Sequence, residues 1–227
     1  MIIFGKRVVL HALAHHNARV ETLYVAKELD KKLFAPLARS GKKIERVDAK
    51  KAQALAHGGN HQGMLAKIEP IHFADNAQVL DCRFALMTVG VTDAGNLGGI
   101  IRTAWALGVE GVVISGVNNL NLEGLIRTSS GAALDMPLFL LPGAPEAIER
   151  FKQAGFFTVG ATLDGVDRRD FKACPAKRVL VLGAEDAGLP GRIEKKLDAK
   201  VTIPMAHGFD SLNVSAAAAI LIDRMRP

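Results

Sequence analysis

The chain has 227 residues, of which 49% are hydrophobic and 23% are charged, and this composition excludes intrinsic disorder and collagen-like structure. The longest apolar run, around residues 214–222, is well short of the ~20 residues that a membrane-spanning helix requires. The 29 Lys and Arg residues exceed the 23 Asp and Glu residues by a formal charge of +6, which favours an anionic partner such as nucleic acid.

Cysteine and histidine usage argues against structural crosslinks. Only Cys82 and Cys174 occur, so neither a disulfide framework nor a cluster of thiolate metal ligands is expected, and metal-binding motifs such as HExxH are missing. The N-terminal stretch has no small-residue cleavage site after an apolar core, which argues against a removable signal peptide. We therefore expect a cytoplasmic protein that uses no metal.

The positive charge is unevenly distributed along the chain. Residues 1–75 contain 13 Lys and Arg against 7 Asp and Glu, whereas residues 76–227 contain 16 of each. Six of the seven histidines also lie in the first segment. This asymmetry indicates two modules, the first of which is suited to a polyanion. Since residues 74–78 form the best linker candidate, we predict domains at residues 1–75 and 76–227.

The first domain is predicted to be a small α/β unit. In chain order we expect a helix at 6–15, a strand at 20–26 and a charged amphipathic segment at 28–39 that leads into residues 43–47. After Asp48, a candidate helix N-cap, we expect a helix to residue 56 and a strand at 63–68.

The second domain alternates apolar β-branched runs with helical segments. Strands are predicted at 84–91, 112–114, 157–161, 179–182 and 201–203, and helices at 97–107, 144–153, 192–197 and 212–225. The strands are continuously apolar rather than alternating, which is typical of a parallel sheet buried on both faces. The expected fold class is therefore α/β with a mostly parallel sheet.

Polar residues cluster where three of these strands should end, which is the edge at which open α/β sheets bind ligands. In residues 93–104, Asn96 is a candidate helix cap. Arg102 lies about 120° from it around the helix axis, and with Asn96 as the cap the two side chains are still able to approach one ligand from different sides. From the residues alone, a cap and a surface arginine are the simpler interpretation. In residues 180–190, Gly183 and Gly188 bracket Glu185 and Asp186.

The glycines of that second segment permit close approach of a ligand to the backbone, although an ordinary loop explains them equally well. The adjacent acids suit a ligand with hydroxyl or amino groups. In the third segment, residues 203–215, Ser211, Asn213 and Ser215 are candidate caps of the last helix. A hydrolase triad is disfavoured because no GxSxG elbow is present, and neither GxGxxG nor a P-loop motif occurs.

Taken in this order, the three segments resemble the three motifs of the SpoU (TrmH-like) family of SPOUT RNA methyltransferases. The matching motifs are Asn96-x-Gly98-x-x-x-Arg102, Gly183-x-Glu185-x-x-Gly188-Leu189, and Ile203-Pro204-Met205 with Ser211-Leu212-Asn213-Val214-Ser215. One departure is Ala94, where the family usually has proline, and it would loosen the loop that enters the helix.

The basic first domain resembles the L30e-like substrate-binding domain of this family, with Phe4-Gly5 near its start and His61-Gln62-Gly63 near its end. This arrangement is most similar to the guanosine-2′-O-ribose methyltransferases of 23S rRNA. The resemblance implies methylation of a ribose 2′-hydroxyl, with a guanosine of 23S rRNA as the expected target. A tRNA ribose 2′-O-methyltransferase, and a non-catalytic RNA-binding or ribosome-assembly factor, are the alternatives.

The resemblance also implies a C-terminal trefoil-knotted domain that binds S-adenosylmethionine without a metal, and a homodimer. The residues that it implies for cofactor binding are Gly183, Ile203 and Leu212, with Thr162 as a further candidate. The residues that it implies for catalysis are Arg102, Asn96, Glu185, Ser211 and Asn213.

Overall fold

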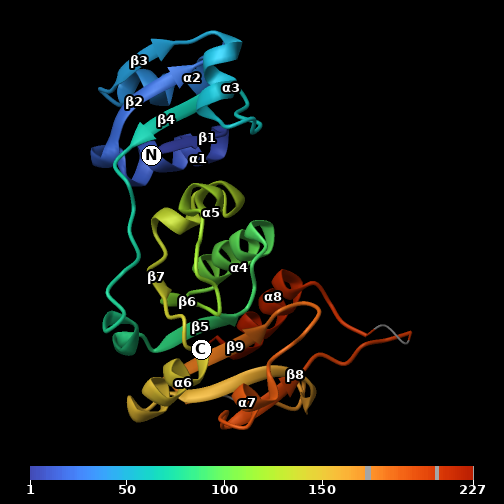
Figure 1. Cartoon of the computed structure of the whole chain (residues 1–227). Coiled ribbons are helices and arrows are strands. Elements are labelled where there is room, and N and C mark those ends of the chain that lie inside the picture. Colours follow the sequence, from blue (N-terminus) through green and yellow to red (C-terminus); the bar gives the residue numbers. More distant parts are fainter. Residues whose placement is uncertain (172–174, 208–209, 227) are drawn as a thin grey trace. The chain divides into compact units, whose positions relative to one another are not determined.

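The computed structural model describes residues 1–171, 175–207 and 210–226, and the chain divides into two units (Figure 1). The first unit comprises Met1–His72 with Asn121–Leu134, and the second comprises Phe73–Leu120 with Asp135–Pro227. The segment 121–134, which charge and composition alone place in the second domain, thus packs with the first unit. Cys174 lies outside the described residues.

The first unit is a four-stranded sheet with short helices. Its strands, in the spatial order β1-β4-β2-β3, are β1 (Ile2–Phe4), β4 (Met64–Ile68), β2 (Val20–Val25) and β3 (Lys43–Arg46). Its helices are α1 (Lys6–His15), α2 (Lys31–Arg39), α3 (Ala49–Leu55) and α5 (Leu122–Thr128), with 3-10 turns η1 (Asn17–Arg19) and η3 (Ala132–Leu134). Strands β2 and β3 pair in parallel, and the other pairs are antiparallel.

Local signals explain most of these boundaries. Asp48 is confirmed as the cap of α3, since its side chain accepts a hydrogen bond from Lys51 N at 2.7 Å. Gln62 Oε1 accepts from Lys6 N at 3.1 Å and so satisfies an amide at the start of α1. The expected element at 28–39 begins later, at Lys31, because Asp30 is its cap.

Two contacts explain why the segment 121–134 packs with the first unit. Ile2 N of β1 donates to Glu123 Oε1 of α5 at 3.1 Å. The backbone of Gly131 lies against the ring of His11, where a Cβ would be 2.9 Å from the nearest ring atom. Helix α5 has only seven residues, which is too short for a periodic apolar pattern to identify it in the sequence.

The second unit contains the predicted parallel sheet. Its spatial order is β10-β8-β9-β5-β6-β7, and the strands are β5 (Phe84–Val89), β6 (Gly111–Ser115), β7 (Leu138–Leu140), β8 (Phe157–Asp167), β9 (Arg178–Gly183) and β10 (Ala199–Thr202). All described pairs in this sheet are parallel. Every residue of β5 and of β6 is buried, as continuous apolar runs predict.

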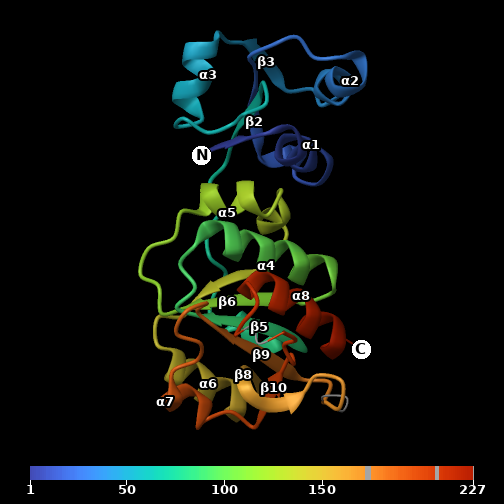
Figure 2. The same cartoon turned by 90° about the vertical axis from the view of Figure 1, so that its right-hand side faces the viewer.

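Helices cover both faces of this sheet. They are α4 (Ala94–Ala106), α6 (Ala144–Gln153), α7 (Gly191–Glu194) and α8 (Val214–Met225), with a 3-10 turn η2 (Gln78–Asp81). Figure 2 shows α4 and α8 together on one face and α6 and α7 on the other. Among the described residues, none of the helices combines the length and the apolar character that crossing a bilayer would demand.

The strand order defines where a ligand is expected. From β5 the chain proceeds through β6 to β7 on one side, while β9 pairs with β5 on the other side, so the order reverses between β5 and β9. The carboxyl ends of these two strands are level, since Val89 pairs with Gly183. Open α/β sheets bind ligands at such a switch point.

Strand β8 extends beyond its predicted end at residue 161. Its register with β10 shifts between Lys200, which pairs with Gly160, and Val201, which pairs with Val166. Residues 161–165 are therefore skipped in the pairing and form a bulge. The backbone of Gly165 approaches Val201 so closely that a Cβ would lie 2.6 Å from it.

Candidate functional site

The three polar segments meet beside the carboxyl ends of β5 and β9. Asn96 Nδ2 donates to Glu185 Oε1 at 2.9 Å. Asn213 Nδ2 donates to the same oxygen at 2.7 Å and to Asn96 Oδ1 at 2.9 Å. Val214 N completes the set around Glu185 Oε1 at 3.4 Å. One carboxylate thus joins three segments that are distant in sequence, and we call Asn96, Glu185 and Asn213 the polar triad.

Asp93 rather than Asn96 is the N-cap of α4, so the predicted capping role of Asn96 is wrong. The Asp93 side chain accepts from Asn96 N at 2.7 Å, and the helix begins at Ala94. An acceptor at this position satisfies one of the orphan amides of the first turn. The amide side chain of Asn96 is consequently engaged with the loops. Ala94 is the first helical residue, a position at which proline and alanine are both compatible with the helix.

Asn213 combines a structural and a site role. Its Oδ1 accepts from Ser215 N at 2.9 Å and from Ser215 Oγ at 2.6 Å, so it is the cap of α8, as expected for this segment. Its Nδ2 is the donor to the polar triad. Ser215 in turn lies against Gly99 of α4, where a Cβ would be 3.1 Å from Ser215 Cβ. A glycine at 99 therefore permits α4 and α8 to pack closely.

Gly183 is required by the loop that follows β9. A Cβ on Gly183 would overlap the backbone of Gly188, because the chain folds back on itself there. Gly188 N donates to Ala184 O at 2.8 Å, and Gly188 has a φ of +61°, which favours glycine. Loop geometry thus explains both glycines, and it fixes the orientation in which Glu185 leaves the loop.

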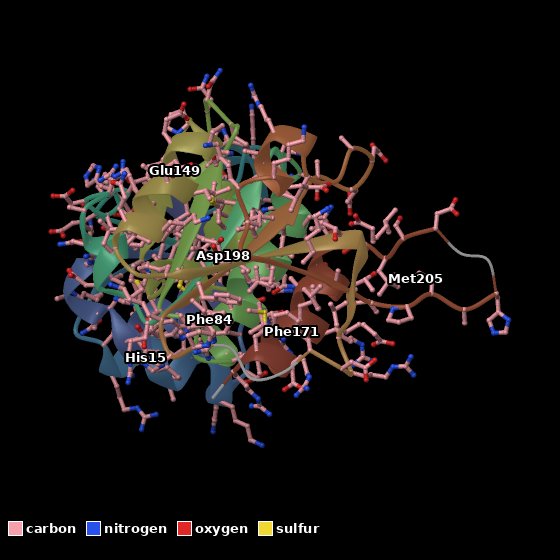
Figure 3. The ribbon with its side chains drawn as sticks, turned by 90° about the horizontal axis from the view of Figure 1, so that it is seen from below. His15, Phe84, Glu149, Phe171, Asp198 and Met205 are labelled. Carbon is pink, nitrogen blue, oxygen red and sulfur yellow. The ribbon has the colours of Figure 1, made fainter. Side chains whose placement is uncertain are left out.

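A cavity of about 470 Å³ opens between the bulge of β8 and the loops that follow β9 and β10. It is lined by Thr162, Gly183, Ile203 and Leu212, the four residues proposed for cofactor binding, and by Glu185 and Ser211. In Figure 1 the orange segment of β8 and the red segment before α8 lie on the same side of this sheet, and Met205, another lining residue, is labelled in Figure 3. This volume is typical of a small-molecule site.

The bulge of β8 places two polar side chains at the cavity. Thr162 Oγ1 is buried and makes no hydrogen bond of ordinary geometry in the described chain, although the hydroxyl lies close enough to Asp164 to act on its carboxylate. The Asp164 pKa is held below its usual range because Lys200 Nζ donates to the carboxylate, and the Thr162 hydroxyl adds to this effect.

Arg102 occupies a different part of the site. It is exposed on α4, six residues after Asn96, which corresponds to about 9 Å along the helix axis. It does not line the cavity, and neither do Asn96 and Asn213, which reach it through Glu185. Long helical side chains lean toward the helix N-terminus, which is the end of α4 that carries Asn96.

Three residues of the site were not identified from the sequence. Asp93 could have been identified, because an Asp whose side chain accepts from the amide three residues later, here that of Asn96, is a common helix N-cap. Asp164 and Lys200 carry none, since they are 36 residues apart and the register shift of β8 alone brings them together.

Comparison with known proteins assigns the chain to a family. The model of the SpoU rRNA Methylase family matches residues 83–223. The chain belongs to this family. A second model, described as the RNA 2′-O ribose methyltransferase substrate binding domain, matches residues 2–74. Membership of the SpoU rRNA Methylase family makes the chain an RNA methyltransferase and confirms the resemblance that the three motifs predicted.

Relatives cover almost the whole chain. The "23S rRNA (guanosine-2'-O-)-methyltransferase RlmB" of Shewanella oneidensis is 30% identical over 97% of this chain and 94% of its own length. The RlmB of Bordetella pertussis has the same identity and coverage.

Solved structures of SpoU proteins share the fold. AviRb from Streptomyces viridochromogenes in complex with AdoMet has a TM-score of 0.78 and 26% identity, covering 99% of this chain and 88% of AviRb. The AdoMet-bound rRNA methyltransferase of Sinorhizobium meliloti has a TM-score of 0.72 and 26% identity, covering 98% of this chain and 85% of that protein. These matches confirm the α/β fold class with its mostly parallel sheet and N-terminal substrate-binding domain.

Proposed function

We propose that this chain transfers a methyl group from S-adenosylmethionine to the ribose 2′-hydroxyl of a guanosine in 23S rRNA. The observation that carries the proposal is the polar triad at the mouth of a cavity of about 470 Å³, which joins all three family motifs. The RlmB relatives, named for guanosine methylation in 23S rRNA, match this chain over 97% of its length and support the choice of substrate.

The residues around the cavity fit S-adenosylmethionine. Gly183, Ile203, Leu212 and Thr162 all line it, and a cavity of this volume is suited to a nucleoside ligand. When bound, the cofactor supplies an electrophilic methyl group on a sulfonium sulfur.

The chain's own residues supply alignment and charge stabilisation, which methyl transfer to a hydroxyl requires. Asn96 and Asn213 present amide groups whose orientation Glu185 fixes, and Ser211 adds a hydroxyl at the cavity. These groups orient the ribose. Arg102 holds the neighbouring phosphate and stabilises the negative charge that develops on the 2′-oxygen. A guanidinium group keeps its proton in proteins, so Arg102 acts as a cation rather than as a base.

The first unit is proposed to dock the RNA. Residues 1–75 carry the whole excess of positive charge, and phosphate neutralisation by Lys and Arg makes binding depend on salt. Exposed Lys31 and Lys32 on α2 test this. Replacing both with Glu should weaken binding of an rRNA fragment and flatten its salt dependence, whereas Lys195→Glu, an exposed control in the second unit, should not.

Three further properties follow from the family and are part of the proposal. They are a trefoil knot formed by the segments around the cavity, a homodimer, and a cytoplasmic location. Light scattering coupled to gel filtration measures the oligomeric state directly.

The decisive experiment compares 2′-O-methylation of rRNA and tRNA from cells with and without this protein. We expect the loss of one guanosine mark in large-subunit rRNA. Loss of a tRNA mark would assign the chain to tRNA instead. Calorimetric titration with S-adenosylmethionine tests the non-catalytic alternative, because absence of binding would favour an assembly factor.

A further inference from the structure

The wall of the cavity is acidic. Five carboxylate residues line it: Asp164, Glu185, Asp186, Glu194 and Asp210. Within residues 1–171, 175–207 and 210–226, no Lys, Arg or His is among the lining residues. The chain as a whole carries a charge of +6, so this local sign is the opposite of the global one. A cavity of this kind favours a cationic ligand over a neutral one of the same shape.

Lys200 fixes two of these carboxylates at the edge of the cavity. Its Nζ lies 3.0 Å from Asp164 Oδ2 and 2.8 Å from Glu194 Oε2. The three residues come from the bulge of β8, from α7 and from β10. One ammonium group therefore spans two carboxylates, which leaves the wall negative while holding Asp164 beside the Thr162 hydroxyl.

We propose that this acidic wall makes the cavity select for charge, so that it binds the cationic sulfonium cofactor more tightly than the neutral thioether product, with Asp164 as a residue that sets the preference. This inference rests on the proposed function and names a property of the same site. It assigns to Asp164, Glu194 and Lys200 a role in cofactor turnover.

The chemistry of the reaction explains why such a preference is useful. In methyl transfer the sulfur–methyl bond breaks with its electron pair left on sulfur, a bond forms between the methyl group and the 2′-oxygen, and the hydroxyl proton passes to solvent water. The sulfonium thereby becomes a neutral thioether, and the net charge of the ligand falls from about +1 to 0. Product then loses its attraction to the wall and is released more readily than fresh cofactor.

The magnitude follows from Coulomb's law. A unit charge about 7 Å from one carboxylate in a water-like dielectric gains roughly threefold in affinity. Asp164 is 69% exposed at its side chain, so the water-like value applies to it and salt screens it. Several carboxylates, opposed by Lys200, give an expected preference of about tenfold at low salt.

Isothermal titration calorimetry of the full chain tests the inference with three ligands. They are S-adenosylmethionine, an analogue that carries an ammonium group in place of the sulfonium, and S-adenosylhomocysteine, the thioether. We expect the two cations to bind about tenfold more tightly than the thioether at low salt, and this preference to shrink as salt is raised.

Two variants should shift the preference in opposite directions. Asp164→Asn should weaken binding of both cations about threefold and leave the thioether unchanged, whereas Lys200→Met should increase the preference. Asp223→Asn, which removes an exposed carboxylate of α8 that does not line the cavity, is the matched control and should change nothing.

Each outcome has a distinct meaning. Equal affinity of the wild-type chain for all three ligands would overturn the charge selection, while cofactor binding would stand. Equal weakening of all three ligands by Asp164→Asn would assign that residue to packing and also overturn it. Failure of every ligand to bind would contradict the proposed function itself.

Discussion

Glu185→Gln is the substitution that tests the polar triad most directly. Glu185 Oε1 accepts from Asn96 Nδ2, Asn213 Nδ2 and Val214 N at 2.9, 2.7 and 3.4 Å. A glutamine oxygen keeps the shape but loses the negative charge, and hydrogen bonds to charged groups contribute about 1 kcal/mol more than neutral ones. Because the side chain is exposed, water compensates part of this difference. We expect a loss of about 1 kcal/mol, or roughly 2–4 °C in Tm.

Thermal unfolding followed by tryptophan fluorescence measures this loss. Trp105 is the only tryptophan in the chain and belongs to α4, so its signal reports on the second unit. The same variant should bind S-adenosylmethionine no more than about threefold more weakly, since only one solvent-exposed carboxylate of the cavity wall is removed. Methyl transfer should fall by about tenfold to a hundredfold, because the Asn96 and Asn213 amides lose their fixed orientation.

Asp223→Asn is the control, since it removes an exposed carboxylate of α8 that does not line the cavity. It should leave both Tm and the rate of methyl transfer close to those of the wild type. Unchanged Tm and unchanged rate in Glu185→Gln would refute the reasoning, because the carboxylate would then neither hold the loops nor orient the ribose.

Three other substitutions test separate parts of the structure. Arg102→Ala should leave S-adenosylmethionine affinity nearly intact by calorimetry and abolish methyl transfer, and wild-type turnover would remove Arg102 from the mechanism. Gly183→Ala should lower the unfolding free energy by about 3 kcal/mol because its Cβ overlaps the Gly188 backbone, whereas Gly188→Ala, whose Cβ points into open space, should cost only about 1 kcal/mol. Burial would raise the Asp198 pKa, but the hydrogen bonds from Thr158 and the ion pair with Lys152 outweigh it and hold that pKa low. Its stabilisation is therefore present above about pH 4 and is lost as pH falls through the lowered pKa, so Asp198→Asn (Figure 3) should reduce the acid sensitivity of Tm.

Sequence patterns predicted most elements of the second unit because its strands are continuously apolar. Helix 144–153 was predicted with its observed bounds, Ala144–Gln153, and strand 179–182 lies within β9. The exceptions are short or depend on partners. β7 has three residues, which is too few for a periodic signal, and the extension of β8 to Asp167 depends on its pairing with β10. In the first unit, α5 was missed for the same reason as β7, since it has only seven residues.

The sequence also identified the polar residues of the site, but the structure assigns the helix-capping and loop-bridging roles to them differently. Asn96 was expected to cap a helix, and Asp93 does so instead. Asn213 caps a helix and donates to Glu185 at once, so the structural and functional interpretations both hold for it. A sequence pattern identifies which side chains are available, whereas the choice between nearby acceptors depends on local backbone geometry.

By itself the sequence determined the family, the fold class and the division of charge between residues 1–75 and the remainder. These depend on composition and on motifs that are local in the chain. Only the tertiary structure joined Asn96 to Asn213 across 117 residues and placed Lys200 against Asp164 across 36. The physical reason is that such contacts arise from strand order and from a register shift, which are decided by the packing of the whole sheet.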